Sequence, residues 1–508
     1  MERKWWTLIA VSVAIFMLLL DITVVNVALP DIQRSLHSSF SDLQWVVNAY
    51  SLTLAAFLLT AGALADRFGR RLVFVTGLVI FTLSSAACGL AGTPLALNLA
   101  RAVQGTGGAM MFATSLALIA QAFRGRDRGV AFGVFGGVIT SGIGWEWIFF
   151  VNVPIGVLGV ILTLTQVSES RDPDAQGVDW LGLVTFSGSL FLLVFALIEG
   201  NEKGWGSTRI VGFLSASLVL IVLFVIVERA QRRPMLDLTL FRRPAFAGAS
   251  IVAFAISASM FAMFLYLTLY IQDVLGYSPL HAGLRFLPIT LLSFAVAPIA
   301  GRLSVRVPVR LLLGSGLLLV SAGLLAMTAV DASSGWTVLI PGFLLAGAGI
   351  GLINPPLAST AIGVVHYSRS GMASGINNTF RQVGIATGIA GLGAIFQHDV
   401  TRNTTAALSS GAGREVLQHT AHGKLMTALV SGEVGHLAHG LPPAASAALM
   451  HSYRVGFTEA FTSILTIAAM VALTGAVFAF ALVRARDFVS SESAPSAEQP
   501  APAVGAAG

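Results

Sequence analysis

Charged residues are scarce in this sequence, and their scarcity excludes a water-soluble protein. Only 11% of the 508 residues are Asp, Glu, Lys or Arg, while 55% are hydrophobic and the mean hydropathy is +0.82. Soluble globular domains carry about 25% charged residues. We therefore expect a chain that is embedded in lipid.

Cysteine and phosphate-binding motifs are also nearly or wholly missing. Cys88 is the only cysteine, which excludes a disulfide framework or a cysteine-based metal site within one chain. No Gly-x-x-x-x-Gly-Lys-Ser/Thr loop occurs, so ATP hydrolysis is not encoded, no cofactor is expected, and an ion gradient must supply any driving force. Six histidines gather in or beside one loop without a carboxylate or cysteine cluster, and no metal site is predicted for His398, His419, His422, His436, His439 and His451.

Apolar runs, by contrast, recur about fourteen times along the chain. Each has roughly the 20 residues that a helix needs to cross about 30 Å of hydrocarbon. The first follows Trp5 and Trp6 without a small-residue cleavage site, so we expect it to be retained. The predicted spans are 5–27, 43–65, 72–91, 94–122, 129–144, 147–167, 178–198, 209–228, 247–271, 281–302, 309–329, 336–365, 370–396 and 457–483.

Lys and Arg gather in alternate loops between these runs. With the N-terminus inside, the inner loops hold 20 of the 30 basic residues and the outer loops hold seven, while Arg101, Arg285 and Arg381 fall within spans. Cytoplasmic loops retain such a positive excess. We predict a multi-pass protein of the plasma or inner membrane with both termini cytoplasmic, and the dispersed charge argues against a nucleic-acid partner.

An internal repeat predicts two bundles. The stretch Gly62-Ala-Leu-Ala-Asp-Arg-Phe-Gly-Arg-Arg71 shares Gly, Leu and two arginines with Gly301-Arg-Leu-Ser-Val-Arg-Val-Pro-Val-Arg310. Repeats of the same orientation are typical of transporters that rock around a central site. We predict six-helix bundles at 1–167 and 241–486, an inserted helix pair and cytoplasmic loop at 168–240, an outer, partly helical loop at about 397–456, and a disordered cytoplasmic tail at 487–508.

Asp21 and Arg101 are the first candidates for function, because charge inside a span is costly. At 1.5 Å per residue, they lie roughly 9 and 10 Å below the outer ends of their spans, so they share a depth. An acid held beside an arginine could act as a proton-dependent switch, although a static buried pair is the alternative. Gln104 lies one helical turn from Arg101, and the following glycines permit close helix packing.

The loop from Gly62 to Arg71 is a second candidate. Its glycines allow a tight turn, and its aspartate can cap a helix start and pair with arginines. Such contacts could lock one state of a transporter, although the arginines also serve topology. The residues assigned to this gating loop are Gly62, Asp66, Arg67, Gly69, Arg70 and Arg71.

Polar residues also occupy the thirteenth span. Arg381 lies roughly 16 Å from the inner end of that span, near mid-membrane. A substrate or helix-bridging role is favoured over simple polar packing. Glycines and the sequence Asn354-Pro-Pro356 suggest that the twelfth span is thin and kinked. The substrate-cavity candidates are Asn26, Gln104, Asn377, Asn378 and Arg381.

With these residues in view, the chain resembles the major facilitator superfamily, specifically its fourteen-helix drug:proton antiporter branch. The matching stretches begin at Leu20, Trp45, Gly62, Arg101, Trp147 and Asn377. The resemblance implies an all-α major facilitator fold. It also implies proton coupling at Asp21 and Arg101, a cytoplasmic gate at Asp66 and Arg70, and cargo between the bundles. Members of this branch often expel antibiotics, dyes or biocides.

One departure concerns the fifth span. The Gly-Pro signature of the family's antiporters is absent, and only 16 residues separate Arg128 from Trp145, about 24 Å of helix. This helix is therefore shortened, but the arginine cluster from Arg229 to Arg243 would lie outside if it failed to cross. Proton-coupled uptake of a small solute, or a transport-inactive deletion variant, remains an alternative function.

The leading hypothesis is proton-coupled efflux of amphipathic, aromatic or cationic, drugs or antibiotics across the plasma membrane. The expected partners are that small-molecule cargo, protons and the lipid bilayer. We expect a monomer, and envelope adaptor proteins are an open alternative.

Overall fold

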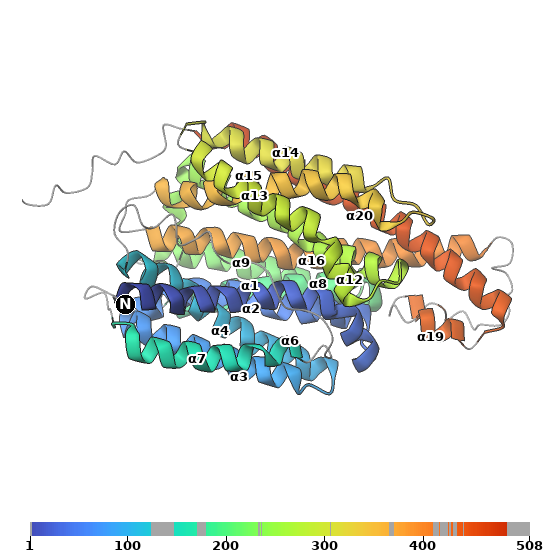
Figure 1. Cartoon of the computed structure of the whole chain (residues 1–508), viewed down its shortest axis with the longest axis horizontal. Coiled ribbons are helices and arrows are strands. Elements are labelled where there is room, and N and C mark those ends of the chain that lie inside the picture. The colour runs from blue at the N-terminus through green and yellow to red at the C-terminus, as the bar shows by residue number, and fades with distance from the viewer. Residues whose placement is uncertain are drawn as a thin grey trace, which may run out of the picture.

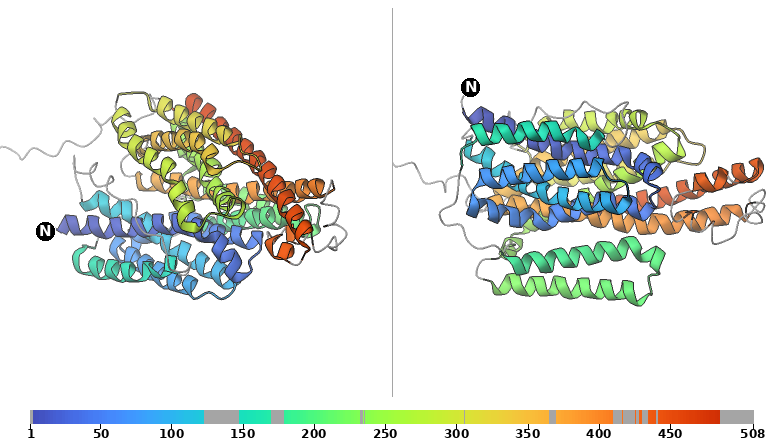
Figure 2. Two further views of the ribbon diagram at one scale, coloured as in Figure 1. Left: turned by 45° about the vertical axis from the view of Figure 1, so that its right-hand side comes forward. Right: turned by 90° about the horizontal axis from the view of Figure 1, so that it is seen from below.

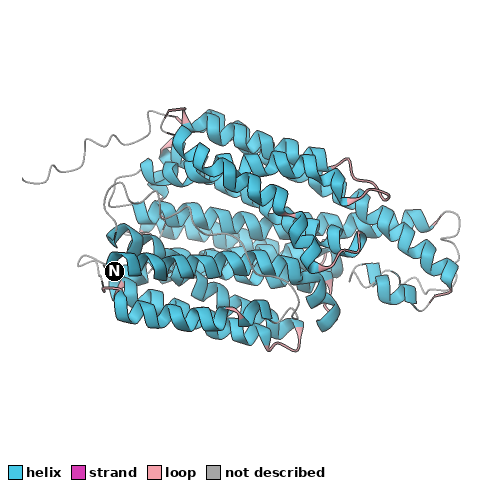
Figure 3. Ribbon diagram, in the orientation of Figure 1, coloured by secondary structure: helices cyan, strands magenta, loops and turns pink. Residues whose placement is uncertain are grey.

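The structure is a computed structural model that describes residues 3–122, 147–169, 179–231, 234, 236–304, 306–364, 370–409, 416, 425, 428–429, 434–439 and 441–484. All regular elements in these ranges are helices, as Figure 3 shows. The long helices run roughly side by side along one direction (Figure 1). The described part is therefore all-α, as the composition predicted.

The N-terminal bundle contains α1 to α7. A capping box starts α2, because Ser39 accepts from the backbone N–H of Asp42 while the Asp42 carboxylate accepts from the Ser39 N–H. Within the bundle, α4 packs between α2 and α3, and α7 packs against α3 and α1. The helices are α1 (Arg3–Leu36), α2 (Phe40–Phe68), α3 (Arg70–Gly89), α4 (Pro94–Ala122), α6 (Trp147–Phe150) and α7 (Asn152–Gln166).

The C-terminal bundle contains α10 to α20. Its first span is interrupted by two π-helical segments, η3 (Ser257–Phe261) and η4 (Tyr270–Val274). Such segments are frequent at functional sites. The other elements are α10 (Pro244–Ile256), α11 (Ala262–Leu269), α12 (Pro279–Arg285), α13 (Leu287–Leu303), α14 (Val309–Met327), η5 (Trp336–Leu339), α15 (Ile340–Gly363), α16 (Ser370–Leu408), α19 (Val434–His439) and α20 (Pro443–Leu482).

The predicted inserted pair consists of α8 (Trp180–Lys203) and α9 (Thr208–Ala230), followed by the short η2 (Leu238–Arg242). Figure 2 shows this green pair lying along one face of the molecule. Ser189 and Ser217 join the two helices, because each hydroxyl donates to the carbonyl of the other residue at 2.8 Å. Helix α8 contacts both α2 and α16, so it covers the line where the two bundles meet.

Within the described residues, eight helical segments are long and apolar enough to cross a membrane, and two shorter apolar helices accompany them. Thirteen of the fourteen predicted spans coincide with described helices. The predicted fifth span, 129–144, lies outside the described residues, as does the predicted tail at 487–508. The full count of fourteen therefore stays a prediction.

The two largest differences from the predicted helix boundaries lie in α16 and α20. Helix α16 continues to Leu408 instead of ending at 396, and α20 begins at Pro443 instead of 457. Both extensions are amphipathic enough to bury apolar side chains outside the main bundle. Together with α19 they form a small separate cluster that includes Leu408, Val434 and Leu449. The predicted polar loop is thus partly helical, and hydropathy alone could not locate where its helices end.

The two bundles meet near one end of the molecule and also along α2, which packs against α16. We call the end where α1 begins and α20 ends the terminal side, and the opposite end, where α19 lies, the loop side (Figure 1). Near the loop side, Phe40 of α2 packs against Tyr266 and Phe396 of the C-terminal bundle, with ring centroids 6.2 and 5.6 Å apart. These residues belong to one cluster that spans both bundles. A second cluster, around Met17 and Phe74, contains only residues from the N-terminal bundle and the segment that follows α7.

Candidate functional site

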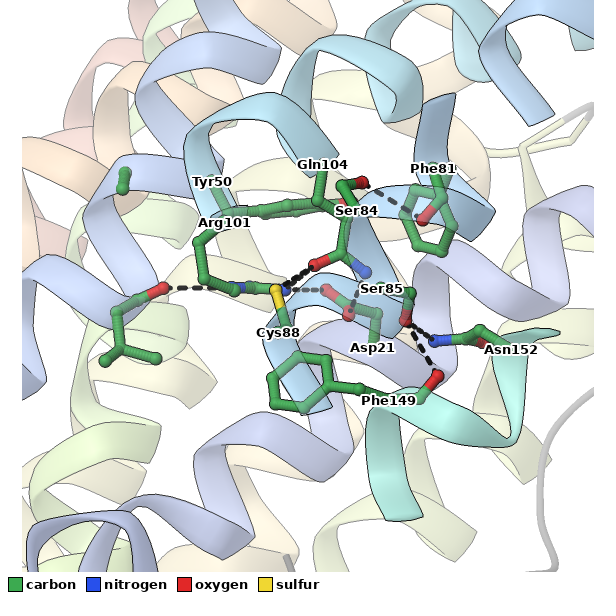
Figure 4. A network of polar contacts seen from close by, with 12 residues as sticks. Asp21, Tyr50, Phe81, Ser84, Ser85, Cys88, Arg101, Gln104, Phe149 and Asn152 are labelled. Atoms are coloured by element: carbon green, nitrogen blue, oxygen red, sulfur yellow. Dashed lines mark hydrogen bonds and ion pairs between the residues drawn. The ribbon is translucent and has the colours of Figure 1, made fainter. Parts of the chain in front are cut away.

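A buried polar network lies inside the N-terminal bundle, and Asp21 and Arg101 are its centre (Figure 4). The Arg101 Nη1 atom lies 2.6 Å from Asp21 Oδ2 and 2.7 Å from Gln104 Oε1. Gln104 Nε2 donates to the other carboxylate oxygen at 2.9 Å, and Arg101 Nε donates to the Val46 carbonyl at 3.0 Å. Three helices, α1, α2 and α4, therefore share one network. The structure brings together Asp21 and Arg101, which the sequence placed at one depth, and adds Gln104 to the pair.

This network is closed to solvent in the present conformation. Asp21 and Arg101 are only 2% and 1% exposed. The guanidinium lies over the Tyr50 ring at 4.4 Å and within 5.8 Å of the Phe149 ring. Cation–π contacts of this kind are strongest where water is excluded. Breaking a buried ion pair by removing one partner typically costs about 3–5 kcal/mol, so protonation of Asp21 would give up a large part of the interaction that stabilises this closed network.

Glycines on α4 bring the helices close enough for these contacts. A Cβ at Gly105 would lie 2.3 Å from the Tyr50 carbonyl oxygen, and one at Gly107 would lie 2.6 Å from the Phe81 backbone nitrogen. No side chain fits there, because the obstacles are backbone atoms. The Arg101 to Gly108 stretch therefore places the guanidinium against the backbone of α2, as the small-residue pattern predicted.

The network is joined to α6 and α7 through a residue that the sequence did not single out. Ser85 on α3 donates to the Phe149 carbonyl at 2.8 Å, and Asn152 Nδ2 donates to Ser85 Oγ at 3.1 Å. Cys88, one turn further along α3, lies with its Sγ atom 3.6 Å from Gln104 Oε1. These contacts hold the Phe149 ring beside Arg101 (Figure 4).

The gating loop has a partner that was not predicted. Glu169, which follows α7, accepts hydrogen bonds from the backbone N–H groups of Arg71 and Leu72 at 2.9 and 3.1 Å. Its carboxylate thereby satisfies the free N–H groups at the positive end of α3. Gly69, with φ of 114°, makes the turn between α2 and α3, and a Cβ there would lie 2.6 Å from the Glu169 carboxylate.

Other residues of the predicted gate are placed as follows. Arg71 Nη1 also donates to the Val167 carbonyl at 3.2 Å, so this arginine fastens α3 to the end of α7. Arg67 is exposed, Arg70 is half-buried, and nothing lies within 4 Å of a Cβ at Gly62. The Asp66 side chain lies outside the description. The gating role stays a prediction.

The second polar group lies in the C-terminal bundle. Arg381 Nη2 on α16 donates to Asn354 Oδ1 on α15 at 2.6 Å, and Asn377 Nδ2 donates to the Ala249 carbonyl of α10 at 3.3 Å. The other two cavity candidates, Asn26 and Asn378, are half-buried. The hydrogen bonds of Arg381 and Asn377 both end on residues of the C-terminal bundle.

A cavity of about 690 Å³ lies elsewhere, between α8, α10 with η3, α16 and α20. Its walls are mostly apolar, with the polar side chains Asn201, Thr387 and His398 at its rim. None of the predicted site residues lines it.

Apolar helices in two bundles, with an ion pair held inside one of them, define a multi-pass membrane transporter rather than an enzyme. The family model of the Major Facilitator Superfamily matches residues 11–389. The chain therefore belongs to the major facilitator superfamily.

Its relatives confirm the resemblance to the drug:proton antiporter branch. The chain is 39% identical to the multidrug resistance protein Stp of Mycobacterium tuberculosis, over 77% of this chain and 75% of that protein. It is 33% identical to the tetracenomycin C resistance and export protein of Streptomyces glaucescens, over 77% and 76% of the two chains. The puromycin resistance protein of Streptomyces alboniger is 35% identical, over 77% and 82%.

Solved structures agree with the fold. The chain aligns with a bacterial homologue of the human lysosomal transporter Spinster in its inward-facing, unoccupied conformation, with a TM-score of 0.57 and 17% identity over 96% of this chain and 99% of that one. The occupied form of the same homologue gives a TM-score of 0.58. At this identity the likeness concerns the fold alone.

Proposed function

We propose that this protein is a secondary active transporter that exports amphipathic drugs or antibiotics across the plasma membrane in exchange for protons. The observation that carries the proposal is the closed network of Asp21, Arg101 and Gln104 inside the N-terminal bundle. The relatives named for multidrug, tetracenomycin C and puromycin resistance support an outward direction of transport.

In this proposal Asp21 carries the proton. In the present conformation its carboxylate accepts from Arg101 and Gln104, which is the geometry of a charge-assisted pair. Protonation would remove the negative charge that attracts Arg101. One carboxyl oxygen would then carry a hydrogen and face the N–H donors of Arg101 and Gln104. Helix α1 would then be free to shift relative to α4. Such a shift could bias a rocking motion of the two bundles, because α1 also contacts α11 and α12 of the other bundle.

The distribution of basic residues favours one orientation of the protein in the membrane. The excess of Lys and Arg in alternate loops favours a cytoplasmic terminal side and both termini inside. The bundles share their aromatic contacts near the loop side. In this orientation those aromatic contacts lie toward the exterior, and cargo would enter from the cytoplasm or the inner leaflet.

Everted membrane vesicles from a pump-deficient bacterium test the proposal. With an acidic vesicle interior, vesicles that contain the chain should accumulate at least one drug from a panel including tetracenomycin C and puromycin. Asp21→Asn should abolish this gradient-driven accumulation, since an amide cannot carry the proton. Asp31→Asn, on the same helix but in an exposed pair with Arg34, is the matched control and should behave as the unmodified chain. Equal accumulation by Asp21→Asn would refute the proposal, as would drug accumulation by intact cells instead of vesicles.

A further inference from the structure

The C-terminal bundle contains a cation without a charge partner. Arg381 lies eleven residues from the start of α16, roughly 16 Å along the helix axis. Within the described part of the chain it forms no ion pair, and its only reported hydrogen-bond acceptor is the neutral Asn354 amide. A buried charge without a counter-ion is costly in a low-dielectric interior.

The contrast with Arg101 is informative. Both arginines lie deep within spans, but Arg101 is neutralised by Asp21 and is 1% exposed. Arg381 and its partner Asn354 are half-buried instead of fully buried, so part of each side chain stays on the accessible surface of the protein. A guanidinium has five N–H donors in a planar fork that matches carboxylate, sulfonate or phenolate oxygens. Asn354 accepts from only one Arg381 nitrogen, Nη2.

The described residues offer no comparable group to a cationic cargo. Asp21 is the only described carboxylate that lies more than one helical turn inside a predicted span, and both its oxygens accept from Arg101 or Gln104. The other described acids near the spans lie close to the predicted span ends, such as Asp179 at the start of α8, Glu228 at the end of α9 and Glu459 within α20. The fixed charge available in mid-membrane is therefore positive.

We propose that Arg381, positioned by Asn354, binds the acidic group of the cargo, so the transported class is amphipathic anions, with an aromatic or apolar body and a carboxylate, sulfonate or phenolate. This inference rests on the proposed function, because it specifies the cargo of the same transporter. The sequence left aromatic and cationic compounds open as cargo, and the inference selects aromatic or apolar compounds that carry an acidic group.

Two dyes that share one ring system test the inference. Fluorescein is an aromatic anion at neutral pH, and a rhodamine ester is a cation built on the same xanthene rings. Binding to the purified full-length chain in detergent and accumulation in everted vesicles are measured for both dyes. The unmodified chain should bind and accumulate the anion in preference to the cation.

Two variants address the guanidinium directly. Arg381→Gln removes the charge, and Asn354→Asp places a carboxylate where the structure has the amide, so that Arg381 is neutralised from within. Each should weaken fluorescein binding at least tenfold, whereas Arg402→Gln, which removes an exposed guanidinium from the same helix, should leave it unchanged. If Arg381→Gln does not fold, the result for Asn354→Asp tests the inference by itself. This variant keeps the Arg381 side chain and the size of the side chain at position 354, and it adds an ion pair.

The outcomes separate the two proposals. Accumulation of the cation but not the anion, or fluorescein binding that is unchanged in Asn354→Asp, would overturn the anion inference and leave drug efflux standing. Failure of the unmodified chain to accumulate either dye or any drug of the panel would contradict efflux itself.

Discussion

At the scale of single residues, the N-terminal bundle depends on one guanidinium being satisfied from three directions. Arg101 contacts a carboxylate, an amide and a backbone carbonyl from three different helices. Each contact is short enough to be a strong hydrogen bond. A change at Asp21 is therefore transmitted directly to α4 and, through the Arg101 guanidinium, to α2, which is what a coupling site requires.

The close approach of α2 and α4 gives a prediction about Gly105. Gly105→Ala places a Cβ 2.2 Å from Thr53 Oγ1 and 2.3 Å from the Tyr50 carbonyl oxygen, so the helices must separate. We expect a loss of about 1–3 kcal/mol in unfolding free energy, as is typical of overpacking, and reduced drug transport. Thermal unfolding of the purified protein measures the first effect.

Gly212→Ala on α9 is the matched control, since nothing lies within 4 Å of a Cβ there. Its melting temperature should stay level or rise slightly, because alanine favours a helix interior by about 0.5–1 kcal/mol over glycine. Equal melting temperatures for the two variants would show that α2 and α4 are not packed as the structure has them.

The sequence predicted those contacts that depend on how deep a residue lies within its membrane span. Counting residues from the span ends placed Asp21 and Arg101 at one level, and the structure shows them in contact. The hydrogen bonds of Glu169 to the start of α3 could not be predicted by counting residues along a span. Glu169 lies 98 residues from Arg71 in a loop, and only the fold brings it to the start of α3. The same holds for Asn354, whose contact with Arg381 depends on how α15 and α16 pack.

At the scale of elements, the start of α3 gives a second prediction. Glu169→Ala removes the carboxylate that accepts from the N–H groups of Arg71 and Leu72. Loss of such a cap typically costs about 1 kcal/mol, within a range of about 0.5–2 kcal/mol. We expect the melting temperature to fall, and Arg71 to become more reactive toward arginine-modifying reagents.

Glu199→Ala serves as the comparison for this variant, because the Glu199 carboxylate makes a salt bridge with Lys203 one turn away at 3.8 Å. Surface pairs of this kind contribute between about 0 and 1 kcal/mol. A melting temperature that falls as much in Glu199→Ala as in Glu169→Ala would argue against a capping role for Glu169.

Helix lengths show what hydropathy can and cannot predict. Apolar runs located the bodies of thirteen described helices. They did not locate the ends of α16 and α20, because beyond the apolar core these helices continue with residues such as Arg402 and Asn403, and their packing against α19 decides their length. Hydropathy also did not predict that the first span of the C-terminal bundle contains two π-helical segments.

At the scale of the whole molecule, the two bundles play different parts in our account. The N-terminal bundle holds a neutralised ion pair, and the C-terminal bundle holds a half-buried cation. The first suits a proton that must be bound and released, and the second suits a charged cargo that must be exchanged. Coupling then requires that occupancy of one site changes the affinity of the other, which is reciprocal by thermodynamic necessity.

This reciprocity leads to the measurement that most directly tests our central claim. If cargo and proton compete through the two bundles, adding a transported drug to the purified protein in weakly buffered detergent should release protons into solution. A pH indicator dye measures the proton release. The release should be abolished in Asp21→Asn and retained in Asp31→Asn. Undiminished proton release by Asp21→Asn would show that Asp21 does not carry the coupled proton.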